Sequence, residues 1–231
     1  MTRRIAIIPA RGGSKRIPRK NIRPFAGQPA LTHILRAAEA TGLFDVIHVS
    51  TDDQEIAEVA AEAGHRPDFR RNAAIADDFT PIRTVMGWTL REFGKRGQYF
   101  ETAALLYATA VFVEPEDIAR AVADFEARHT HPVLAVSEVG TPIEKLFVNE
   151  DGLLHTVDKS RFGARTQDLT PAYQDAGAFG VFSAASLLAE DNGGAPLHFR
   201  PFILDRWKAI DIDTEEDWAL AERLHAARTL S

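Results

Sequence analysis

Five basic side chains follow the first apolar run of the chain, in a segment that also holds two glycines. The run covers residues 5–8 and stops at Pro9, and the segment comes directly after it. Its cations are Arg11, Lys15, Arg16, Arg19 and Lys20. No Asp or Glu occurs before Glu39, although the chain carries a formal net charge of -6. Such a local concentration of positive charge on an acidic protein is typical of a site that binds a polyanion.

The remaining residues of this basic segment, residues 9–21, suit it to a chain of phosphates. Gly12 and Gly13 leave backbone N–H groups open to an anion at the end of a strand, because glycine has no Cβ. The Ser14 hydroxyl can donate to a phosphate oxygen, and the Asn21 amide can donate to a phosphate or a sugar hydroxyl. The Walker A and Gly-x-Gly-x-x-Gly spacings are both absent here. The segment therefore predicts a phosphate site of another design, with a solvated basic surface loop as the alternative.

Two aspartates near the C-terminus could bind a metal ion. Asp211 and Asp213 lie at the end of an apolar run, residues 209–212, that predicts a strand. Alternate residues of a strand share a face, so both carboxylates should point the same way. Such a pair suits a hard divalent cation, Mg²⁺ above all, and a cation would offset the repulsion between the two like charges. The alternative is a turn and an N-cap in front of a helix that begins at Thr214.

Two further polar segments have interpretations that the residues alone leave open. Residues 107–112 place small polar groups directly after a buried strand, where they would contact a ligand or form a turn before Pro115. Residues 165–168 and 173–179 hold polar side chains around the start of an apolar strand. They would form either a binding loop or an ordinary surface loop.

The elements that must position these residues alternate between short β-branched runs and amphipathic segments, which is typical of an α/β fold. Expected strands cover residues 5–8, 46–49, 103–106, 133–136, 176–182, 199–204 and 209–212. Expected helices cover residues 31–40, 52–64 with Asp52 as N-cap, 81–93, 115–128 and the stretch after Thr214. Residues 139–175 carry Gly, Pro and turn signals and predict an inserted hairpin arm. No repeat or linker is visible, so we expect one domain over residues 1–231.

Composition excludes several classes of site and partner. The chain has no Cys, which excludes disulfides and thiolate metal sites and leads us to expect a cytoplasmic protein. The N-terminus lacks a signal-peptide pattern, and no apolar run approaches the ~20 residues of a membrane span. A pI of about 5.8 argues against general binding to nucleic acid. We therefore expect a small anionic ligand, with no nucleic acid and no membrane among the partners.

Several of these motifs together resemble one known family. Residues 8–15, Ile-Pro-Ala-Arg-Gly-Gly-Ser-Lys, continuing to Lys20 and Asn21, are similar to the first motif of the acylneuraminate (CMP-sialic acid) cytidylyltransferases. The family's later motifs are matched in order, so the resemblance covers nearly the whole chain. These later matches are residues 50–53, 69–71, Asp78 and residues 211–218. Residues 107–112 and 165–179 look closer to the pseudaminic acid branch than to the sialic acid branch.

The resemblance implies a fold and an activity. The fold would be a Rossmann-like nucleotidyltransferase, a three-layer α/β/α arrangement with a mostly parallel sheet and an inserted β-hairpin arm that makes a homodimer. The activity would be that of a Mg²⁺-dependent cytidylyltransferase, which joins CTP to an acidic nine-carbon sugar and releases the CMP-sugar and pyrophosphate. The resemblance points to a nonulosonic, sialic-like sugar, with pseudaminic acid as the expected acceptor.

The resemblance also implies roles for individual residues. The catalytic residues would be Arg11, Lys15, Lys20 and Asp211, and the metal ligands Asp211 and Asp213. The nucleotide would be bound by Ala10, Arg11, Gly12, Gly13, Ser14, Lys15, Lys20, Asn21, Arg71, Asp78 and Thr109. The sugar would be bound by Tyr107, Arg165, Gln167, Asp168, Tyr173, Asp175 and Phe179.

The chain departs from the pseudaminic branch in segments expected to contact the sugar. Val111 replaces a usual Pro, and Glu144-Lys145 stands where Gln-Arg is expected. Ala178 and Gly180 are small where the branch carries Gln and Tyr. A cytidylyltransferase for a different acidic sugar is therefore an alternative. A metal-dependent glycosyltransferase with an Asp-x-Asp site and a non-catalytic nucleotide-binding protein are the others.

Overall fold

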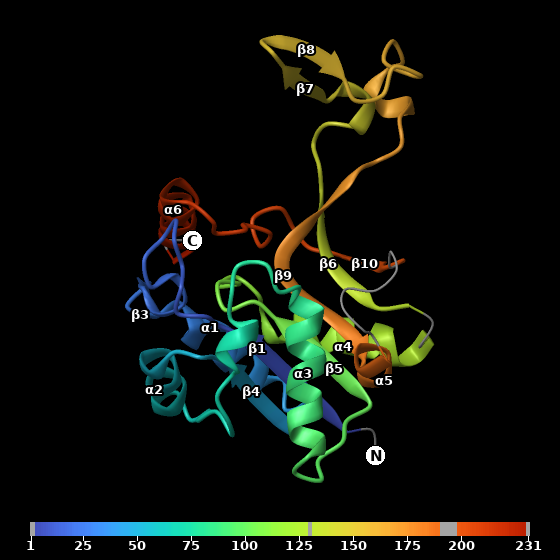
Figure 1. Ribbon diagram of the computed structural model, residues 1–231. Coiled ribbons are helices and arrows are strands. Elements are labelled where there is room, and N and C mark those ends of the chain that lie inside the picture. Colours follow the sequence, from blue (N-terminus) through green and yellow to red (C-terminus); the bar gives the residue numbers. More distant parts are fainter. Residues whose placement is uncertain (1–2, 129–130, 190–197, 230–231) are drawn as a thin grey trace.

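A six-stranded sheet forms the centre of the protein, with the strand order β10-β6-β9-β5-β1-β4 (Figure 1). The computed structural model describes residues 3–128, 131–189 and 198–229. β9 runs antiparallel to β5 and β6, and the other neighbouring strands are parallel, which confirms a mostly parallel α/β sheet. The strands are β1 (Arg4–Pro9), β4 (Val46–Ser50), β5 (Thr102–Leu106), β6 (Val133–Glu138), β9 (Tyr173–Ser183) and β10 (Arg200–Ile203).

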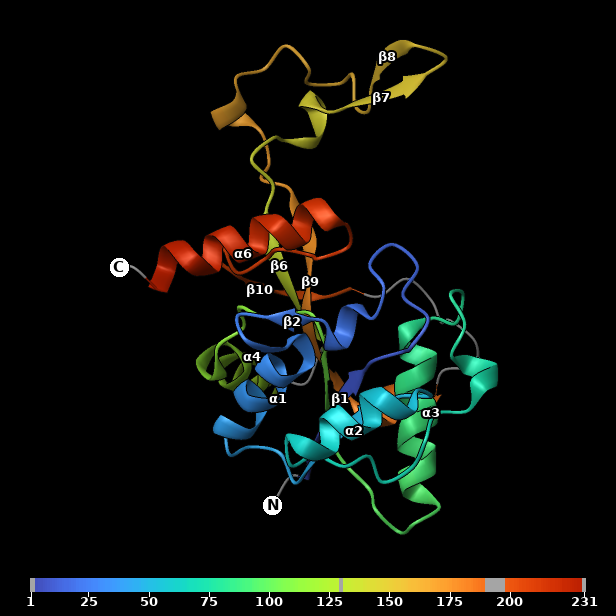
Figure 2. The same cartoon turned by 90° about the vertical axis from the view of Figure 1, so that its left-hand side faces the viewer.

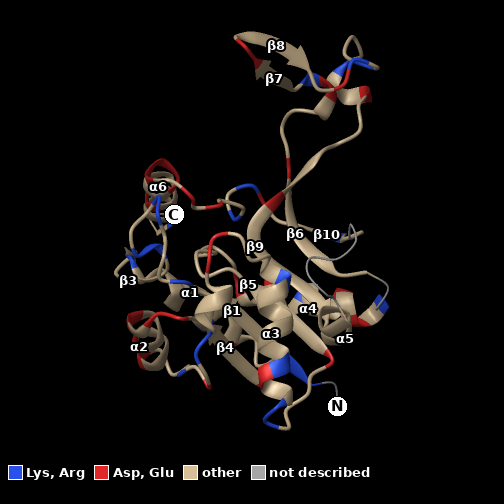
Figure 3. Cartoon of the chain, in the orientation of Figure 1, with Lys and Arg blue, Asp and Glu red and all other residues tan. Residues whose placement is uncertain are grey.

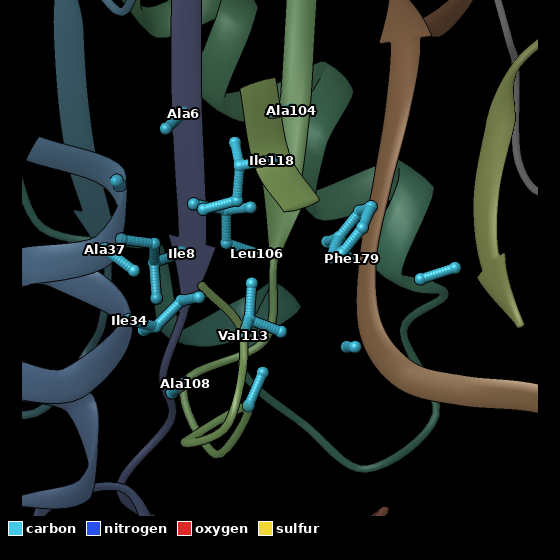
Figure 4. Packing of buried hydrophobic residues seen from close by; sticks show 14 of the residues in the cluster. Ala6, Ile8, Ile34, Ala37, Ala104, Leu106, Ala108, Val113, Ile118 and Phe179 are labelled. Carbon is cyan, nitrogen blue, oxygen red and sulfur yellow. The ribbon is translucent and has the colours of Figure 1, made fainter. Parts of the chain in front are cut away.

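Helices cover both faces of this sheet, because the side chains of its central strands alternate between two apolar clusters. Ala6 and Ile8 of β1 pack with α1 (Ala30–Ala40), α2 (Gln54–Glu62) and α4 (Pro115–Arg128) on one face. Ile5 and Ile7 pack with α3 (Ile82–Gly94) and α5 (Ala184–Ala189) on the other. Figure 4 shows the first cluster, where Ile34 of α1 lies beside Ile8. The result is the expected three-layer arrangement.

A third apolar cluster lies under the C-terminal helix, α6 (Glu215–Thr229). Trp218 is buried there, edge-on to Phe25, with ring centroids 5.8 Å apart. Phe25 belongs to a small hairpin of β2 (Pro24–Phe25) and β3 (Gln28–Pro29). Ile17, Phe112 and Ile212 complete the cluster. The cluster therefore joins three segments expected to form the site: the basic segment, the residues after β5 and the C-terminal aspartates.

An arm leaves the sheet between β6 and β9 and projects away from it (Figures 1 and 2). Its hairpin of β7 (Phe147–Glu150) and β8 (Leu153–Thr156) confirms the predicted excursion. Asp151 and Gly152 join the strands with φ values of 52° and 83°, the two positive values of a type I′ turn. Leu153 and Leu154 are 66% and 68% exposed. Adjacent strand residues point to opposite faces, so both faces of the hairpin are uncovered in the described chain.

Two predicted elements are wrong in detail. Residues 209–212 form no strand, because Ala209 and Ile212 are buried as anchors of an extended connection rather than as members of a ladder. The N-cap of α2 is Asp53 rather than Asp52, and the Asp53 carboxylate accepts from the backbone N of Ile56 at 3.0 Å. α6 follows Thr214 as predicted, and Thr214 and Asp217 form a capping pair with reciprocal bonds of 2.8 and 3.2 Å.

Four short 3-10 turns complete the described elements, and none of the described helices is long and apolar enough to cross a membrane. The turns are η1 (Lys20–Ile22), η2 (Ala73–Ile75), η3 (Ile143–Lys145) and η4 (Thr166–Asp168).

Candidate active site

A cavity of about 290 Å³ opens at the carboxyl ends of β1 and β5. The chain passes from β1 to β4 on one side and later returns to β5 on the other side of β1. Ligands of open α/β sheets bind at such a reversal of strand order. The cavity is lined by Pro9, Arg11, Ser14, Lys15, Arg16, Ile17, Lys20, Asn21, Arg71, Ile75, Asp77, Asp78, Thr80, Ile82, Val85, Tyr107, Ala108, Thr109 and Asp213. The structure thus brings together most residues predicted to bind the nucleotide.

Asp78 holds two of the predicted phosphate-binding cations. Its carboxylate accepts a hydrogen bond from Arg11 and lies 2.5 Å from the Lys15 ammonium. The hydrogen bonds from Lys15 and Arg11 lower the pKa of Asp78. Asp78 therefore stands where a phosphate group would meet the same two cations, and an incoming triphosphate would compete with it.

Asp213 joins the C-terminal segment to the basic segment. Its carboxylate lies 2.6 Å from the Arg16 guanidinium and 3.0 Å from the Lys20 ammonium, which also donates to the carbonyl of Ile212 at 2.7 Å. Burial alone would raise the pKa of Asp213, but the hydrogen bonds and charges of Lys20 and Arg16 outweigh it and lower that pKa. Two segments almost two hundred residues apart in sequence are thereby fixed on one side of the cavity.

Asp211 lies in a setting that favours a bound cation. Burial, and then the neighbouring charge of Asp213, raises the pKa of Asp211. A Cβ at Gly177 would lie 2.7 Å from the Asp211 carboxyl carbon, and Gly177 has a φ of +57°, so glycine leaves the space that this carboxylate occupies. Two hard oxygen donors that repel each other fit Mg²⁺, which commonly takes one or two carboxylates together with substrate phosphates.

The described side chains of this site do not by themselves form a complete set of metal ligands. Among the described residues, no group of three or more His, Asp or Glu side chains is arranged to hold a metal ion. A metal here would need oxygen ligands from the substrate in addition to Asp211 and Asp213. This fits a metal that arrives with the nucleotide rather than a resident structural ion.

Arg71 supplies a buried positive charge at the cavity wall. The residue is 7% exposed and its guanidinium donates to the carbonyl of Ser50, whereas its Nε has no hydrogen-bond partner among the residues that the structure describes. Burial is the main cause that lowers the pKa of Arg71, to about 10, so the group stays charged at neutral pH. A buried N–H without a partner, beside a cavity, is poised to donate to a ligand oxygen. The sequence offered only the family resemblance as a reason to choose this arginine.

Gly12 has an internal role that the sequence did not reveal. A Cβ at Gly12 would lie 2.4 Å from the Asp53 carboxylate, which is bound by Arg19 at 2.6 Å. A Cβ at Gly13, by contrast, would meet no atom of the described residues within 4 Å, so Gly13 has open space beside it. Ala10 is buried in the core, and Asn21 donates its amide to the carbonyl of Arg11 at 3.0 Å. Ala10 and Gly12 thus support the basic segment from behind.

The residues predicted to bind the sugar are not gathered in one place. Tyr107 lines the cavity, and its pKa is raised to about 12, chiefly by burial and then by Asp175 and Asp211, so its phenol is a donor at neutral pH. Asp175 accepts from the backbone N of Gly177 at 2.9 Å. Tyr173 is exposed at the start of β9. Arg165, Gln167 and Asp168 lie on the arm, which points away from the chain's own sheet (Figure 1).

The expectation that Phe179 contacts the sugar needs correction. Its side chain is 1% exposed and packs against Phe202 with ring centroids 5.4 Å apart, so it belongs to the core (Figure 4). Core packing also explains the small residues on either side of Phe179. Ala178 is buried in the same cluster, and a Cβ at Gly180 would lie 2.8 Å from the Phe182 ring. These two departures from the pseudaminic branch therefore change core packing and not the lining of the cavity.

Several lining residues were missed by sequence reasoning. Arg16 was noted as basic without a role, and its contact with Asp213 could not be foreseen from sequence spacing. The segment between η2 and α3 contributes Asp77 and Thr80, and the first residue of α3, Ile82, also lines the cavity. The one local signal there is Asp77, whose carboxylate accepts from the backbone N of Phe79 and of Thr80, as in an Asx turn.

Comparison with known proteins agrees with this geometry. A sequence model described as "Cytidylyltransferase" matches residues 5–182. Pseudaminic acid cytidylyltransferase of Campylobacter jejuni is 36% identical over 222 residues, which cover 96% of this chain and 95% of the relative. CMP-N,N'-diacetyllegionaminic acid synthase of Legionella pneumophila is 32% identical over 228 residues, which cover 95% of each protein.

Solved structures show the same fold at low identity. CMP:2-keto-3-deoxy-manno-octonic acid synthetase, complexed with CTP, superposes with a TM-score of 0.73 at 14% identity, covering 98% of this chain and 100% of that one. A 4-diphosphocytidyl-2C-methyl-D-erythritol synthase superposes with a TM-score of 0.67 at 17% identity, covering 97% and 99%. On the family match and on two relatives aligned over almost their full length, the chain belongs to the cytidylyltransferase family and is a nucleotidyltransferase.

Proposed function

We propose that the protein transfers the cytidylyl group of CTP to an acidic nine-carbon 2-keto sugar of the pseudaminic type, with Mg²⁺, and releases pyrophosphate. The observation that carries this proposal is the cavity beyond β1 and β5, where Arg11 and Lys15 meet Asp78 and Lys20 meets Asp213. The similarity to the pseudaminic and legionaminic enzymes, at 36% and 32% identity, supports the sugar class. The same similarity favours nucleotidyl transfer over a glycosyltransferase activity.

The residues of the site suit an in-line displacement at the α-phosphorus. The anomeric hydroxyl oxygen of the sugar forms a bond to that phosphorus, the bond from it to the bridging oxygen of pyrophosphate breaks, and the hydroxyl proton passes to water. Negative charge grows on the departing pyrophosphate, and Arg11 and Lys15 are placed to neutralise it once Asp78 is displaced. Asp211 and Asp213 would hold Mg²⁺, which supplies charge neutralisation at the phosphate oxygens.

Pyrophosphate release from a panel of substrates tests the proposal. CTP and Mg²⁺ would be combined separately with pseudaminic, legionaminic, sialic and 3-deoxy-octulosonic acids, and ATP, GTP and UTP would replace CTP as controls. Among the four nucleotides, we expect CTP to be the one that releases pyrophosphate. Among the sugar acids, we expect the largest kcat/KM with pseudaminic acid. Release with the eight-carbon acid only would move the assignment to a different acidic sugar. CMP formed from an added CMP-sugar, without pyrophosphate, would favour a glycosyltransferase.

We also propose that the arm pairs two copies of the chain. The arm carries exposed apolar side chains at Ile143, Leu146, Phe147, Val148, Leu153, Leu154, Val157 and Phe162. Its hairpin strands are almost free of charge, as their tan colour in Figure 3 shows. Arg165 and Asp168 belong to the same arm, which projects away from the chain's own sheet (Figure 1), so a sugar site that uses them would take them from a second copy.

Replacing Leu153 and Leu154 by Asp is expected to raise the dimer dissociation constant by about 100-fold or more. Each buried leucine contributes about 1.5–3 kcal/mol, and tenfold in affinity corresponds to about 1.4 kcal/mol. Light scattering after size exclusion, over a range of protein concentrations, measures this. Leu220→Asp is the matched control, because Leu220 is 54% exposed on α6. A double variant as dimeric as the control would contradict the proposal.

A further inference from the structure

Lys208 is a buried cation with no place in the site described so far. It lies in the connection from β10 to α6, and its side chain is 8% exposed. Its ammonium donates to Asp117 at 2.6 Å and to Glu114. Asp117 in turn accepts from the backbone N of Glu114 at 3.1 Å, which closes the first turn of α4. Lys208 therefore binds a fixed pair of carboxylates at the N-terminus of that helix.

The two segments joined by Lys208 both supply the cavity. Glu114 comes shortly after Tyr107 and Thr109, which line it, and Lys208 comes shortly before Asp211 and Asp213. Phe112, on the first segment, also packs edge-on to Trp207, on the second, with ring centroids 6.1 Å apart. The ion pairs thus connect the strand end beside the cavity to the segment that carries both carboxylates.

Side chains, rather than a strand ladder, fix this second segment. Beyond the bond from Leu204 to Val136, the backbone N–H bonds of residues 205–209 form a local turn, from Lys208 to Asp205 and from Ala209 to Arg206. The segment is then held at one end by Lys208 and at the other by Asp213, which meets Lys20 and Arg16. Burial alone would lower the pKa of Lys208, but the hydrogen bonds that its ammonium donates to Asp117 and Glu114 outweigh burial and raise that pKa.

We infer that Lys208 is a positioning residue for the metal site: its ion pairs with Asp117 and Glu114 fix residues 205–213 against the segment after β5, so that Asp213 is held at the cavity, with Asp211 two residues before it on the same fixed segment. The inference rests on the proposed function, since it assigns Lys208 to the metal ligands of that reaction. Lys208 itself is not among the residues that line the cavity. It acts through the two aspartates that follow it.

Lys208→Met keeps the length of the side chain and removes the ion pairs. We expect the affinity for Mn²⁺ in the presence of a non-hydrolysable CTP analogue to fall by about 10- to 100-fold, the usual cost of losing a group that orients metal ligands. Electron paramagnetic resonance of free Mn²⁺ measures this without turnover. The KM for the sugar acid at saturating metal is expected to change little. Lys95→Met is the matched control, because Lys95 makes an exposed ion pair with Glu92.

A second variant separates positioning from stability. Lys208→Met removes the ammonium that meets the buried Asp117, while Glu114 keeps a contact with Arg228 at 3.5 Å, and the loss of the buried pair destabilises the fold. The triple variant Lys208→Met, Glu114→Gln, Asp117→Asn removes all three charges, and we expect it to regain thermal stability while keeping the weak Mn²⁺ binding. Wild-type Mn²⁺ affinity in the triple variant would overturn the inference. If the wild type releases no pyrophosphate yet Lys208→Met lowers its Mn²⁺ affinity, the proposed function fails and the positioning role stands.

Discussion

Lys15→Ala is expected to lower kcat for pyrophosphate release by about 10²- to 10³-fold, the usual cost of removing one donor aimed at charge that develops in a transition state. The Lys15 ammonium lies at the cavity, and its one ion pair within the described part of the chain is with the Asp78 carboxylate, at 2.5 Å. Its side chain is 80% exposed, so its removal should leave the fold intact. Initial rates of pyrophosphate release against CTP concentration, with thermal unfolding in parallel, measure both effects.

The comparison with Lys15→Arg shows whether charge alone is needed. Arginine keeps the positive charge, so we expect this variant to recover a large part of the loss, whereas Lys15→Gln should behave like alanine. Lys159→Ala, on the arm, controls for the removal of an exposed lysine elsewhere. An unchanged kcat in Lys15→Ala would exclude Lys15 from the reaction and leave Arg11 as the cation that meets the leaving group.

The basic segment could be recognised from sequence because its information is local. Strand, glycines and cations follow one another within residues 5–21, and each has a preference that does not depend on the rest of the chain. The direction of β9 and the depth of Phe179 within the sheet depend on which strands become neighbours. Phe179, which looks like part of a binding loop in the sequence, is therefore a core residue.

The C-terminal aspartates differ from the basic segment, because the local structure predicted for them is wrong although Asp213 lies beside the cations of that segment. Alternating apolar residues at 209–212 predicted a strand, but Ile212 is buried beneath α6 and Ala209 against the sheet. What places Asp213 at the cavity is its contact with Lys20 and Arg16, which no local pattern encodes. Arg71 is similar, since its burial at the cavity wall follows from tertiary packing alone.

Asp211→Asn and Asp213→Asn are both expected to lower activity at physiological Mg²⁺ by about 10²-fold or more, because each removes one of two hard ligands and the metal contributes several kcal/mol to the transition state. The half-saturating Mg²⁺ concentration should rise in both variants. A titration of pyrophosphate release with Mg²⁺ measures this, and an unchanged curve in both variants would reject the metal site. Gly177→Ala should give a smaller defect of the same kind, because its Cβ would displace the Asp211 carboxylate.

The two substitutions should have opposite effects on stability, which distinguishes loss of a ligand from loss of the fold. Burial and the charge of Asp213 raise the pKa of Asp211, so ionising Asp211 costs stability as the pH rises through that pKa. Asp211→Asn should therefore be at least as stable as the wild type at pH 7, with the advantage vanishing in acid. The pKa of Asp213 is lowered by Lys20 and Arg16, so its charge stabilises the fold above its unfolded pKa, and Asp213→Asn should be less stable at pH 7. Thermal unfolding from pH 3 to 8 tests this, and equal losses of stability in both variants would contradict it.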